Sequence, residues 1–356
     1  MATPWLACSR LVRSLIEGGG ASHTRGHELL ITFDKVSKSY TNNELAVNMV
    51  SMEIAAGELF VLLGTSGSGK TTLLRMINRL EDPTSGVITV GGRSVMEQDP
   101  VALRRNIGYS VQGTRLFPHM TIGANIAITP SLLGWDNERL VHRINELLEM
   151  VGLEPDQYIH RYPSELSGGQ NQRVGVARAL AADPPVILMD EPFGAIDPIT
   201  RDRLQDEFLQ LQAHLKKTVV FVTHDVFEAF KLGDRIAILN EGMVQQVDTP
   251  EMIASVPASK FVEDFLGHNR ILLLMQNRQV GELQEEYEPL VPTAAAGFTA
   301  TIDVKDSLAT ALEKFRSANM RRLPVISESQ MLGLLSVDTV TNHLIPGDCP
   351  AEGALK

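Results

Sequence analysis

Residues 64–71 read GTSGSGKT and end in an ammonium and a hydroxyl side chain, Lys70 and Thr71. Glycines allow the backbone to turn tightly and to direct several N–H groups at one point, which suits a phosphate group. A lysine there neutralises phosphate charge, and the threonine hydroxyl ligates Mg²⁺. The pattern therefore predicts a nucleotide phosphate site, and its predicted contacts are Gly64, Thr65, Ser66, Gly67, Ser68, Gly69, Lys70, Thr71 and Thr72.

Two adjacent carboxylates, Asp190 and Glu191, follow a second apolar run that spans residues 186–189. The carboxyl end of a buried parallel strand faces the ligand crevice of an open α/β sheet. We therefore predict that Asp190 holds Mg²⁺ and that Glu191 acts as the general base on an attacking water. The alternative, if the pair stood alone, is that it ends a strand and caps the next element.

A third segment, LSGGQ, spans residues 166–170. Ser167 is a suitable N-cap residue, and Gly168 and Gly169 leave the backbone amides of the first helical turn uncovered. Taken alone, this segment is an ordinary helix start, and its meaning depends on the two motifs above.

The elements that must position these residues predict an α/β fold with a mainly parallel sheet. An apolar run at 59–63 precedes the glycine loop and helical spacing follows it, so the loop joins a strand to a helix. A helical pattern at 204–215 lies between the apolar strands VILMD and TVVFVT, which makes a βαβ unit. Residues 115–175 are rich in helical patterning and should form a separate helical subdomain.

In order and spacing, the three segments resemble the phosphate loop, the acidic strand end and the signature motif of ATP-binding-cassette (ABC) ATPases. The resemblance covers about residues 29–268 and implies a P-loop NTPase fold, a RecA-like core sheet with a helical subdomain, that uses ATP and Mg²⁺. It implies that Tyr40 stacks on adenine and that Gln112 takes part in binding Mg²⁺ and in catalysis. It also implies that Asp197 lies in a loop at a dimer interface and that His224 contacts the γ-phosphate. Each of these four residues, taken singly, has a structural explanation as well.

The resemblance also implies partners. In this family the signature of one subunit completes the phosphate loop of another, in a head-to-tail dimer, and the signature residues here are Ser167, Gly168, Gly169 and Gln170. The transporter branch adds two transmembrane permease subunits and an extracytoplasmic solute-binding protein. Such a subunit lies peripherally at the cytoplasmic face of the cell membrane, and Leu116–Thr121 is our candidate for its permease contact.

Longer stretches, from Met76 to Leu80 with the EDPTSG that follows and around the signature, resemble importers of quaternary amines such as glycine betaine, choline and carnitine. Two departures, Gly113 and Asn171, leave the predicted chemistry unchanged. Because an ATPase subunit does not touch the solute, an importer of another small solute such as amino acids stays an alternative. A non-transport ABC ATPase is a further one, although the sequence has no tandem cassette or long coiled-coil insertion.

Composition agrees with this interpretation. The 356 residues are 44% hydrophobic and 21% charged, with a formal net charge of −11 and a pI near 5.3. An acidic chain without a basic patch argues against nucleic acid as the main partner. No apolar run reaches the roughly 18 residues of a membrane-spanning helix, and two cysteines at opposite ends indicate no disulfide framework. Residues 1–28 are expected to be a disordered extension, with a weak amphipathic interfacial segment as the alternative.

The pattern changes after residue 268. Residues 269–297 suggest a weakly structured linker, and residues 298–346 predict a small α+β unit in βαββα order with helices capped by Asp306 and Asp338, followed by a tail at 347–356. This unit resembles a single cystathionine-β-synthase (CBS) motif, an appendage that quaternary-amine importer ATPases often carry.

The resemblance implies that Ser336 and Asp338 bind a regulatory nucleotide, whereas capping alone explains them equally well. The basic pair Arg321 and Arg322 offers an alternative contact with anionic lipid. Because a lone copy cannot readily cover its own apolar sheet face, we also expect it to pair with the same unit of a second subunit.

Overall fold

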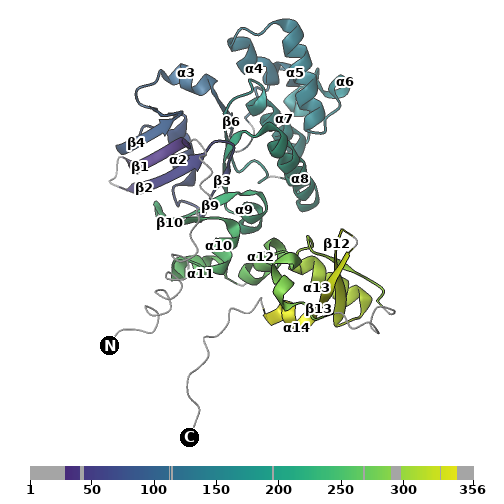
Figure 1. The fold of residues 1–356 in the computed structure, drawn as a ribbon. Helices are drawn as coiled ribbons and strands as arrows, with labels where there is room; N and C mark the ends of the chain where they lie inside the picture. The colour runs from purple at the N-terminus through teal and green to yellow at the C-terminus, as the bar shows by residue number, and fades with distance from the viewer. Residues whose placement is uncertain are drawn as a thin grey trace, which may run out of the picture.

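The computed structural model describes residues 29–40, 44–111, 113, 115–194, 196–267, 269–289, 298–328 and 330–342. The predictions for the extension at 1–28, for Gln112 and for the tail at 347–356 lie outside these residues. Within the described ranges a large α/β part, residues 29–267 and called the cassette below, precedes a smaller C-terminal part (Figure 1). No helix in these ranges is both long and apolar enough to cross a lipid bilayer.

A mostly parallel sheet forms the centre of the cassette. Its strands are β3 (Leu59–Gly64), β6 (Ile107–Ser110), β7 (Val186–Asp190), β8 (Thr218–Thr223), β9 (Arg235–Asn240) and β10 (Met243–Asp248). They follow the order β10-β9-β3-β8-β7-β6, and only β10 pairs antiparallel with its neighbour. Every residue of β3, β7 and β8 is buried, as expected for strands covered on both faces.

The sheet separates two cores, because successive residues of a strand point to opposite faces. On one face, Phe60 and Leu62 pack with α2 (Lys70–Ile77) and with a second sheet. On the other face, Val61 and Leu63 share a core with three helices. These helices are α7 (Gly168–Leu180), α8 (Pro198–Leu215) and α9 (Val226–Leu232).

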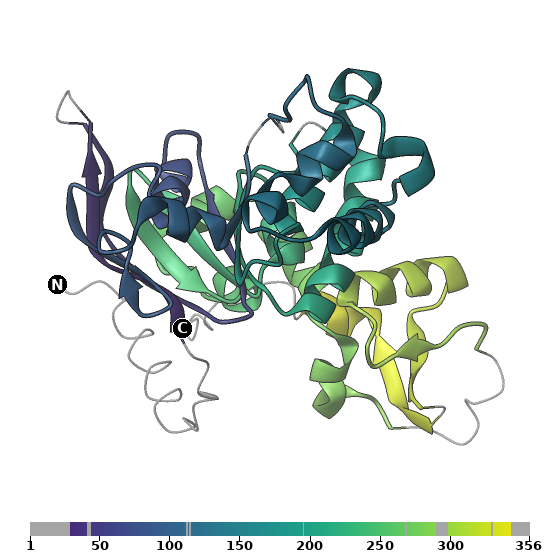
Figure 2. The same ribbon diagram turned by 90° about the horizontal axis from the view of Figure 1, so that it is seen from above.

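The second sheet is antiparallel and lies at the end of the cassette away from the C-terminal part (Figures 1 and 2). It consists of β1 (Leu29–Ser39), β2 (Leu45–Ala55), β4 (Ser85–Val90) and β5 (Arg93–Ser94), in the order β2-β1-β4-β5. A short helix, α3 (Pro100–Arg105), connects this sheet to β6.

The helix-rich segment expected at 115–175 forms a helical layer beside β6 and α8 (Figure 1). It contains α4 (Ile122–Leu132), α5 (Asn137–Met150), α6 (Pro155–Tyr158), the 3-10 helix η1 (Pro163–Glu165) and the first part of α7. Side-chain caps begin the longer helices, since Thr121, Asp136 and Ser167 each accept a hydrogen bond from the first turn.

Residues 269–289 are not a weakly structured linker, so that prediction is wrong for them. They form α12 (Asn269–Asn277) and the 3-10 helix η2 (Val280–Glu286). Leu273 and Val280 are fully buried, and both belong to the core that also contains Val61 and Leu63. The physical reason is that α12 packs on α9 and on α10 (Pro250–Ser255), with α11 (Lys260–Leu266) alongside, so short apolar runs that look weak in sequence find partners.

The C-terminal unit, residues 298–342, has the expected element order. Its elements are β11 (Ile302–Asp303), α13 (Leu308–Ala318), β12 (Arg322–Ser327), β13 (Gln330–Ser336) and α14 (Val337–Asn342). β12 lies between a parallel β11 and an antiparallel β13. α13 packs on α12, so the unit lies against the cassette in both views (Figures 1 and 2).

Two details of this unit differ from expectation. The helix caps are Ser307 and Ser336, whose hydroxyls accept from backbone N–H groups, rather than Asp306 and Asp338. The sheet is also covered within one chain: Leu323, Val325 and Leu335 are fully buried. Residues 280–288 supply part of this cover, since Tyr287 lies against Gly333 and residue 288 pairs with β13. Our premise that the sheet needs a second copy to cover it is therefore wrong.

Candidate active site

The glycine loop lies between β3 and α2, and two of its glycines, Gly64 and Gly69, have no room for a side chain. Gly69 is the N-cap of α2 with φ 97°, and a Cβ there would stand 2.4 Å from the carbonyl oxygen of Ala46. A Cβ on Gly64 would stand 2.3 Å from the carbonyl oxygen of Leu239. The loop therefore keeps its shape only with glycine at these positions.

The ammonium of Lys70 is held over this loop. Its Nζ donates to the carbonyl oxygens of Gly64 and Thr65 at 2.8 and 2.7 Å, and Ser68 lies at 3.4 Å. The side chain is nearly buried, and this burial lowers the pKa of Lys70 against the opposing effect of Glu191 and Asp190. A weakly hydrated cation enclosed by backbone is suited to an anionic ligand that can offset its desolvation.

The loop, Glu191 and His224 line one pocket of about 620 Å³. The residues around it are Ala46, Ser66, Gly67, Ser68, Gly69, Lys70, Thr71, Thr72, Glu191 and His224. The structure thus brings most of the predicted contacts to one place, although they come from residues far apart in the sequence. Thr65 contributes its carbonyl to Lys70 instead of lining the pocket.

Thr71, which lines this pocket, contacts Asp190, which lies just behind the lining. The hydroxyl of Thr71 donates to Oδ1 of Asp190 at 3.0 Å, and burial raises the pKa of Asp190. A hydroxyl and a carboxylate that converge beside a phosphate site fit Mg²⁺, which usually binds through one or two protein oxygens plus phosphate and water. The described residues contain no group of three or more His, Cys, Asp and Glu side chains that could hold a metal by themselves.

Glu191 occupies an uncommon backbone conformation. Its φ is 47°, in the left-handed region, while its N–H donates to the carbonyl oxygen of Val222 at 3.0 Å. Such conformations cost energy and are retained where the surrounding structure requires them. Here the conformation directs the carboxylate to His224, whose Nδ1 lies 3.0 Å from Oε1 of Glu191. Glu191 and His224 thus form a hydrogen-bonded pair in the lining of the pocket.

The signature residues lie apart from this pocket. Ser167 and Gln170 form a reciprocal capping box, and Gln170 also donates to the hydroxyl of Tyr158 at 3.0 Å. Ser167 and Gly168 are exposed. None of the four residues from Ser167 to Gln170 is among those that line the pocket in the described part of the chain.

Two other predicted residues are also at the surface. Tyr40 follows β1 and is 43% exposed, with the ammonium of Lys38 5.2 Å from its ring centre. Asp197 is the N-cap of α8 and accepts from the N–H of Thr200 at 3.0 Å, which lowers the pKa of Asp197. Neither residue lines the pocket, so neither completes the site within this chain.

In the C-terminal unit, Ser336 and Asp338 make separate contacts. Ser336 is 8% exposed, and its hydroxyl accepts from the N–H of Thr339 at 3.0 Å. Asp338 pairs with Arg321 at 2.8 Å in the open, and Arg322 pairs with Glu288 at 3.2 Å. Each side chain therefore has a structural role in this fold.

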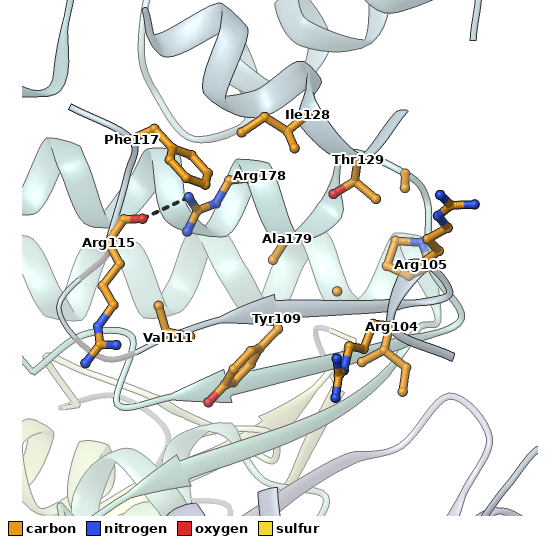
Figure 3. A pocket seen from close by; sticks show the side chains of 14 residues that line it. Arg104, Arg105, Tyr109, Val111, Arg115, Phe117, Ile128, Thr129, Arg178 and Ala179 are labelled. Atoms are coloured by element: carbon orange, nitrogen blue, oxygen red, sulfur yellow. Dashed lines mark hydrogen bonds between the residues drawn. The ribbon is translucent and has the colours of Figure 1, made fainter. Parts of the chain in front are cut away.

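A second pocket, of about 340 Å³, lies where β6 meets α4 and α7 (Figure 3). Four arginines line it, Arg104, Arg105, Arg115 and Arg178, and no acidic residue is among the described residues that do so. Arg178 donates to the carbonyl oxygen of Arg115 at 3.1 Å, and burial lowers the pKa of Arg178. The basic character is local, because the whole chain is acidic.

The predicted contact stretch Leu116–Thr121 borders this pocket through Phe117, which is 46% exposed. A fully buried side chain, Asn125, holds the stretch in place. Its amide accepts from the N–H of Phe117 at 2.8 Å and donates to the carbonyl oxygens of Phe117, Met120 and Thr121 at 3.0–3.2 Å.

Sequence reasoning missed Asn125, the four arginines and Ala46. Asn125 stands in a helical pattern, where asparagine is usually a surface residue. The arginines are spread over residues 104–178, and no local motif joins them. Ala46 lines the phosphate pocket from β2, a contact that only the packing of the two sheets creates.

Comparison with known proteins identifies the family. A family profile described as ABC transporter matches residues 47–194. The glycine betaine/carnitine/choline transport ATP-binding protein OpuCA of Bacillus subtilis is 48% identical over 315 residues, which cover 88% of this chain and 80% of that protein. The glycine betaine uptake system ATP-binding protein YehX of Escherichia coli is 41% identical over 308 residues, which cover 86% and 97%.

Solved structures of ATP-binding cassettes resemble the fold of this chain. The dimeric structure of a post-hydrolysis state of the ATP-binding cassette MJ0796, bound to ADP and Pi, has a TM-score of 0.57 and 33% identity, and covers 62% of this chain and 98% of that one. These findings confirm the P-loop fold and the resemblance to quaternary amine importer subunits. The chain therefore belongs to the ATP-binding subunits of ABC transporters and is an ABC-type ATPase.

Proposed function

We propose that this ATPase energises the import of quaternary amine osmolytes such as glycine betaine, choline, carnitine or proline betaine. The observation that carries the proposal is the extent of the similarity to OpuCA, because an alignment of 315 residues cannot fit inside the cassette of residues 29–267. It must include much of the C-terminal part, which distinguishes this chain from a generic cassette. The choline transport ATP-binding protein OpuBA of Bacillus subtilis, 47% identical over 312 residues, supports the same solute class.

In the reaction we propose, ATP lies in the pocket of the glycine loop. The loop amides and Lys70 bind its phosphates, and Tyr40 approaches its adenine. Thr71, Asp190 and Gln112 are the residues that would hold Mg²⁺. When bound, Mg²⁺ would supply positive charge that stabilises the negative charge of the phosphate groups.

Glu191 then accepts a proton from the attacking water, and His224 orients the γ-phosphate and the carboxylate of Glu191. The 3.0 Å contact between His224 and Glu191 supports this division of roles, because a base must be held in place to act on one water. Burial raises the pKa of Asp190, because an ionised carboxylate is poorly solvated there. A bound cation would offset the free energy that this desolvation costs, which supports a cation site beside Asp190.

A second ATPase subunit completes the site. The exposed signature residues Ser167 and Gly168 have free access to a partner and do not reach the pocket of their own chain. Donors from a second copy, aimed at the phosphate oxygens, would supply the remaining transition-state stabilisation. Asp197, exposed at the start of α8, lies in the loop that such a partner would meet.

Two permease subunits, fed by an extracytoplasmic solute-binding protein, would carry the solute. Their contact with this subunit is the surface formed by Leu116–Thr121 and the basic pocket of Figure 3. The four hydrogen bonds of Asn125 support this, because a loop held so firmly transmits motion instead of absorbing it. Such binding would place the chain peripherally at the cytoplasmic face of the membrane.

The C-terminal unit is proposed to regulate this activity as a CBS-like motif that binds a nucleotide or anionic lipid. The order β11-α13-β12-β13-α14 supports the comparison. The exposed side chains of Arg321 and Asp338, 79% and 70% exposed, are the groups through which a ligand could act.

The test is uptake of labelled glycine betaine, choline, carnitine and proline at low and high osmolarity. It uses cells that lack this gene and carry either the wild-type chain or the Glu191→Gln variant. We expect uptake of at least one amine to be lost and to return only with the wild type. Unchanged uptake of all four compounds would reject the solute class, and uptake of amino acids would be measured next.

A further inference from the structure

Two loops lead directly into neighbouring helices, one that carries His224 in the pocket lining and one that carries Asp197 outside it. His224 is followed by Asp225, the N-cap of α9, whose carboxylate accepts from the N–H groups of Phe227 and Glu228 at 2.9 and 3.2 Å. Asp197 is itself the N-cap of α8. The position of each loop is therefore tied to the position of its helix, and the distance between the loops depends on how α8 and α9 meet.

Polar side chains join these helices at three levels. Arg201 of α8 lies 3.7 Å from Asp225, Gln205 donates to Glu228 at 3.0 Å, and Asp206 pairs with Lys231 at 2.8 Å. The members on α8 follow i, i+4 and i+5 spacing, and those on α9 follow i, i+3 and i+6. On α8 this spacing places Arg201 and Gln205 on one side of the helix, with Asp206 next to that side, and on α9 the contacting residues follow one side.

The middle link is buried. Gln205 and Glu228 are 5% and 7% exposed, and the hydroxyl of Thr223, the last residue of β8, also contacts the carboxylate of Glu228. Burial raises the pKa of Glu228, and the hydrogen bonds from Gln205 and Thr223 oppose this rise. A buried hydrogen bond is directional, so this link fixes how α8 and α9 meet more specifically than an apolar contact would.

Arg201 extends the link to the other loop. Its Nη2 donates to the carbonyl oxygen of Ile196 at 2.9 Å, immediately before Asp197. One guanidinium thus contacts the residue before Asp197 and the residue after His224.

We propose that Arg201, Gln205 and Glu228 are positioning residues for ATP hydrolysis, which fix the loop of Asp197 relative to His224 and so hold His224 against Glu191. The inference rests on the role of His224 given under Proposed function. None of the three residues lines the phosphate pocket, so they act through the two loops rather than on ATP.

The test exchanges the members of the buried link in the full chain. Gln205→Glu alone places a second carboxylate against that of Glu228. Glu228→Ala alone removes the carboxylate that accepts the hydrogen bond from Gln205. Each should lower kcat for ATP hydrolysis by about tenfold or more, because small misplacements of catalytic groups are costly. KM for ATP should stay unchanged. The double variant Gln205→Glu, Glu228→Gln restores one amide against one carboxylate and should recover most of kcat.

Arg203→Ala is the matched control, since it removes the exposed pair of Arg203 with Glu207 from the same helix and should keep the wild-type kcat. Where a buried single variant does not yield folded protein, Arg201→Ala tests the same connection at a side chain that is 29% exposed. Wild-type kcat in the folded single variants, or a double variant as slow as its parents, would overturn the proposal.

His224→Ala separates this proposal from the one on which it rests. If His224→Ala hydrolyses ATP at the wild-type rate, the assigned role of His224 fails. If His224→Ala is slow while Glu228→Ala is not, the role of His224 stands and only the positioning inference fails.

Discussion

The cassette and the C-terminal part relate sequence to structure in different ways. In the cassette, Gly69, Lys70 and Glu191 belong to motifs whose residue types and spacing alone indicate their chemistry, and the fold gathers them around one pocket. In the C-terminal part, the decisive residues are ordinary ones such as Leu273, which is fully buried between helices. The contrast teaches that sequence motifs predict the residues that bind ligands. The packing of the C-terminal part on the cassette instead depends on apolar residues that belong to no motif. Five substitutions test this contrast.

The largest effect is expected at the ATP site of the cassette. Glu191→Gln removes the proposed base while keeping the side-chain shape, so hydrolysis should fall by about 10²–10⁴-fold and ATP should still bind. Phosphate release and nucleotide binding by the same preparation check this. Glu97→Gln, at an exposed position, is the control. Hydrolysis at the normal rate in Glu191→Gln would mean that another group acts as the base.

Leu273→Ala tests the attachment of the C-terminal part. Leu273 is fully buried, so truncation should cost about 2–5 kcal/mol of unfolding free energy through lost burial and a residual cavity. Its neighbour Leu272 is 49% exposed, and Leu272→Ala should change stability by less than about 0.5 kcal/mol. Denaturant unfolding of both variants gives the comparison. Equal stabilities would show that α12 is not part of a shared core.

Asp190→Asn tests whether the ATP site carries a stability cost. Burial raises the pKa of Asp190 above 3.8, so the folded state binds its proton more tightly than the unfolded state does. Folding therefore loses stability as pH rises above 3.8, and the loss is complete once the pH lies above the raised pKa of Asp190. The nucleotide-free variant should melt at a higher temperature than the wild type at pH 7, with a difference that shrinks toward pH 4. A lower melting temperature at pH 7 would contradict this.

The smallest effects are expected at the surface of the C-terminal unit. Ser336→Ala removes the cap of α14 and should cost about 0.5–2 kcal/mol. Arg321→Ala breaks an exposed ion pair and should cost less than about 1 kcal/mol. Thermal unfolding measures both. A larger loss in Arg321→Ala than in Ser336→Ala would show that the exposed pair does more for the fold than its geometry indicates.

Much of the ATP site could be predicted from the sequence. A glycine loop after an apolar strand has few conformations, so the position of Lys70 beside that loop could be predicted. A carboxylate at the end of a buried parallel strand faces the ligand crevice, so the position of Asp190 could be predicted as well. The capping residues of the C-terminal unit could not. Asp306 and Ser307 are both good caps, and in the structure Ser307 caps α13 while the carboxylate of Asp306 accepts from the N–H of Asp303 and pairs with Lys314.

By itself, the sequence determined the family, the α/β fold and the groups that we propose bind phosphate, because these depend on local patterns that allow few geometries. Only the tertiary structure decided that residues 269–289 are packed helices, that Ala46 closes the phosphate pocket, and that Gln205 meets Glu228. The physical reason is that these contacts join residues distant in the chain. Their free energy comes from the exclusion of water between surfaces that exist only after folding.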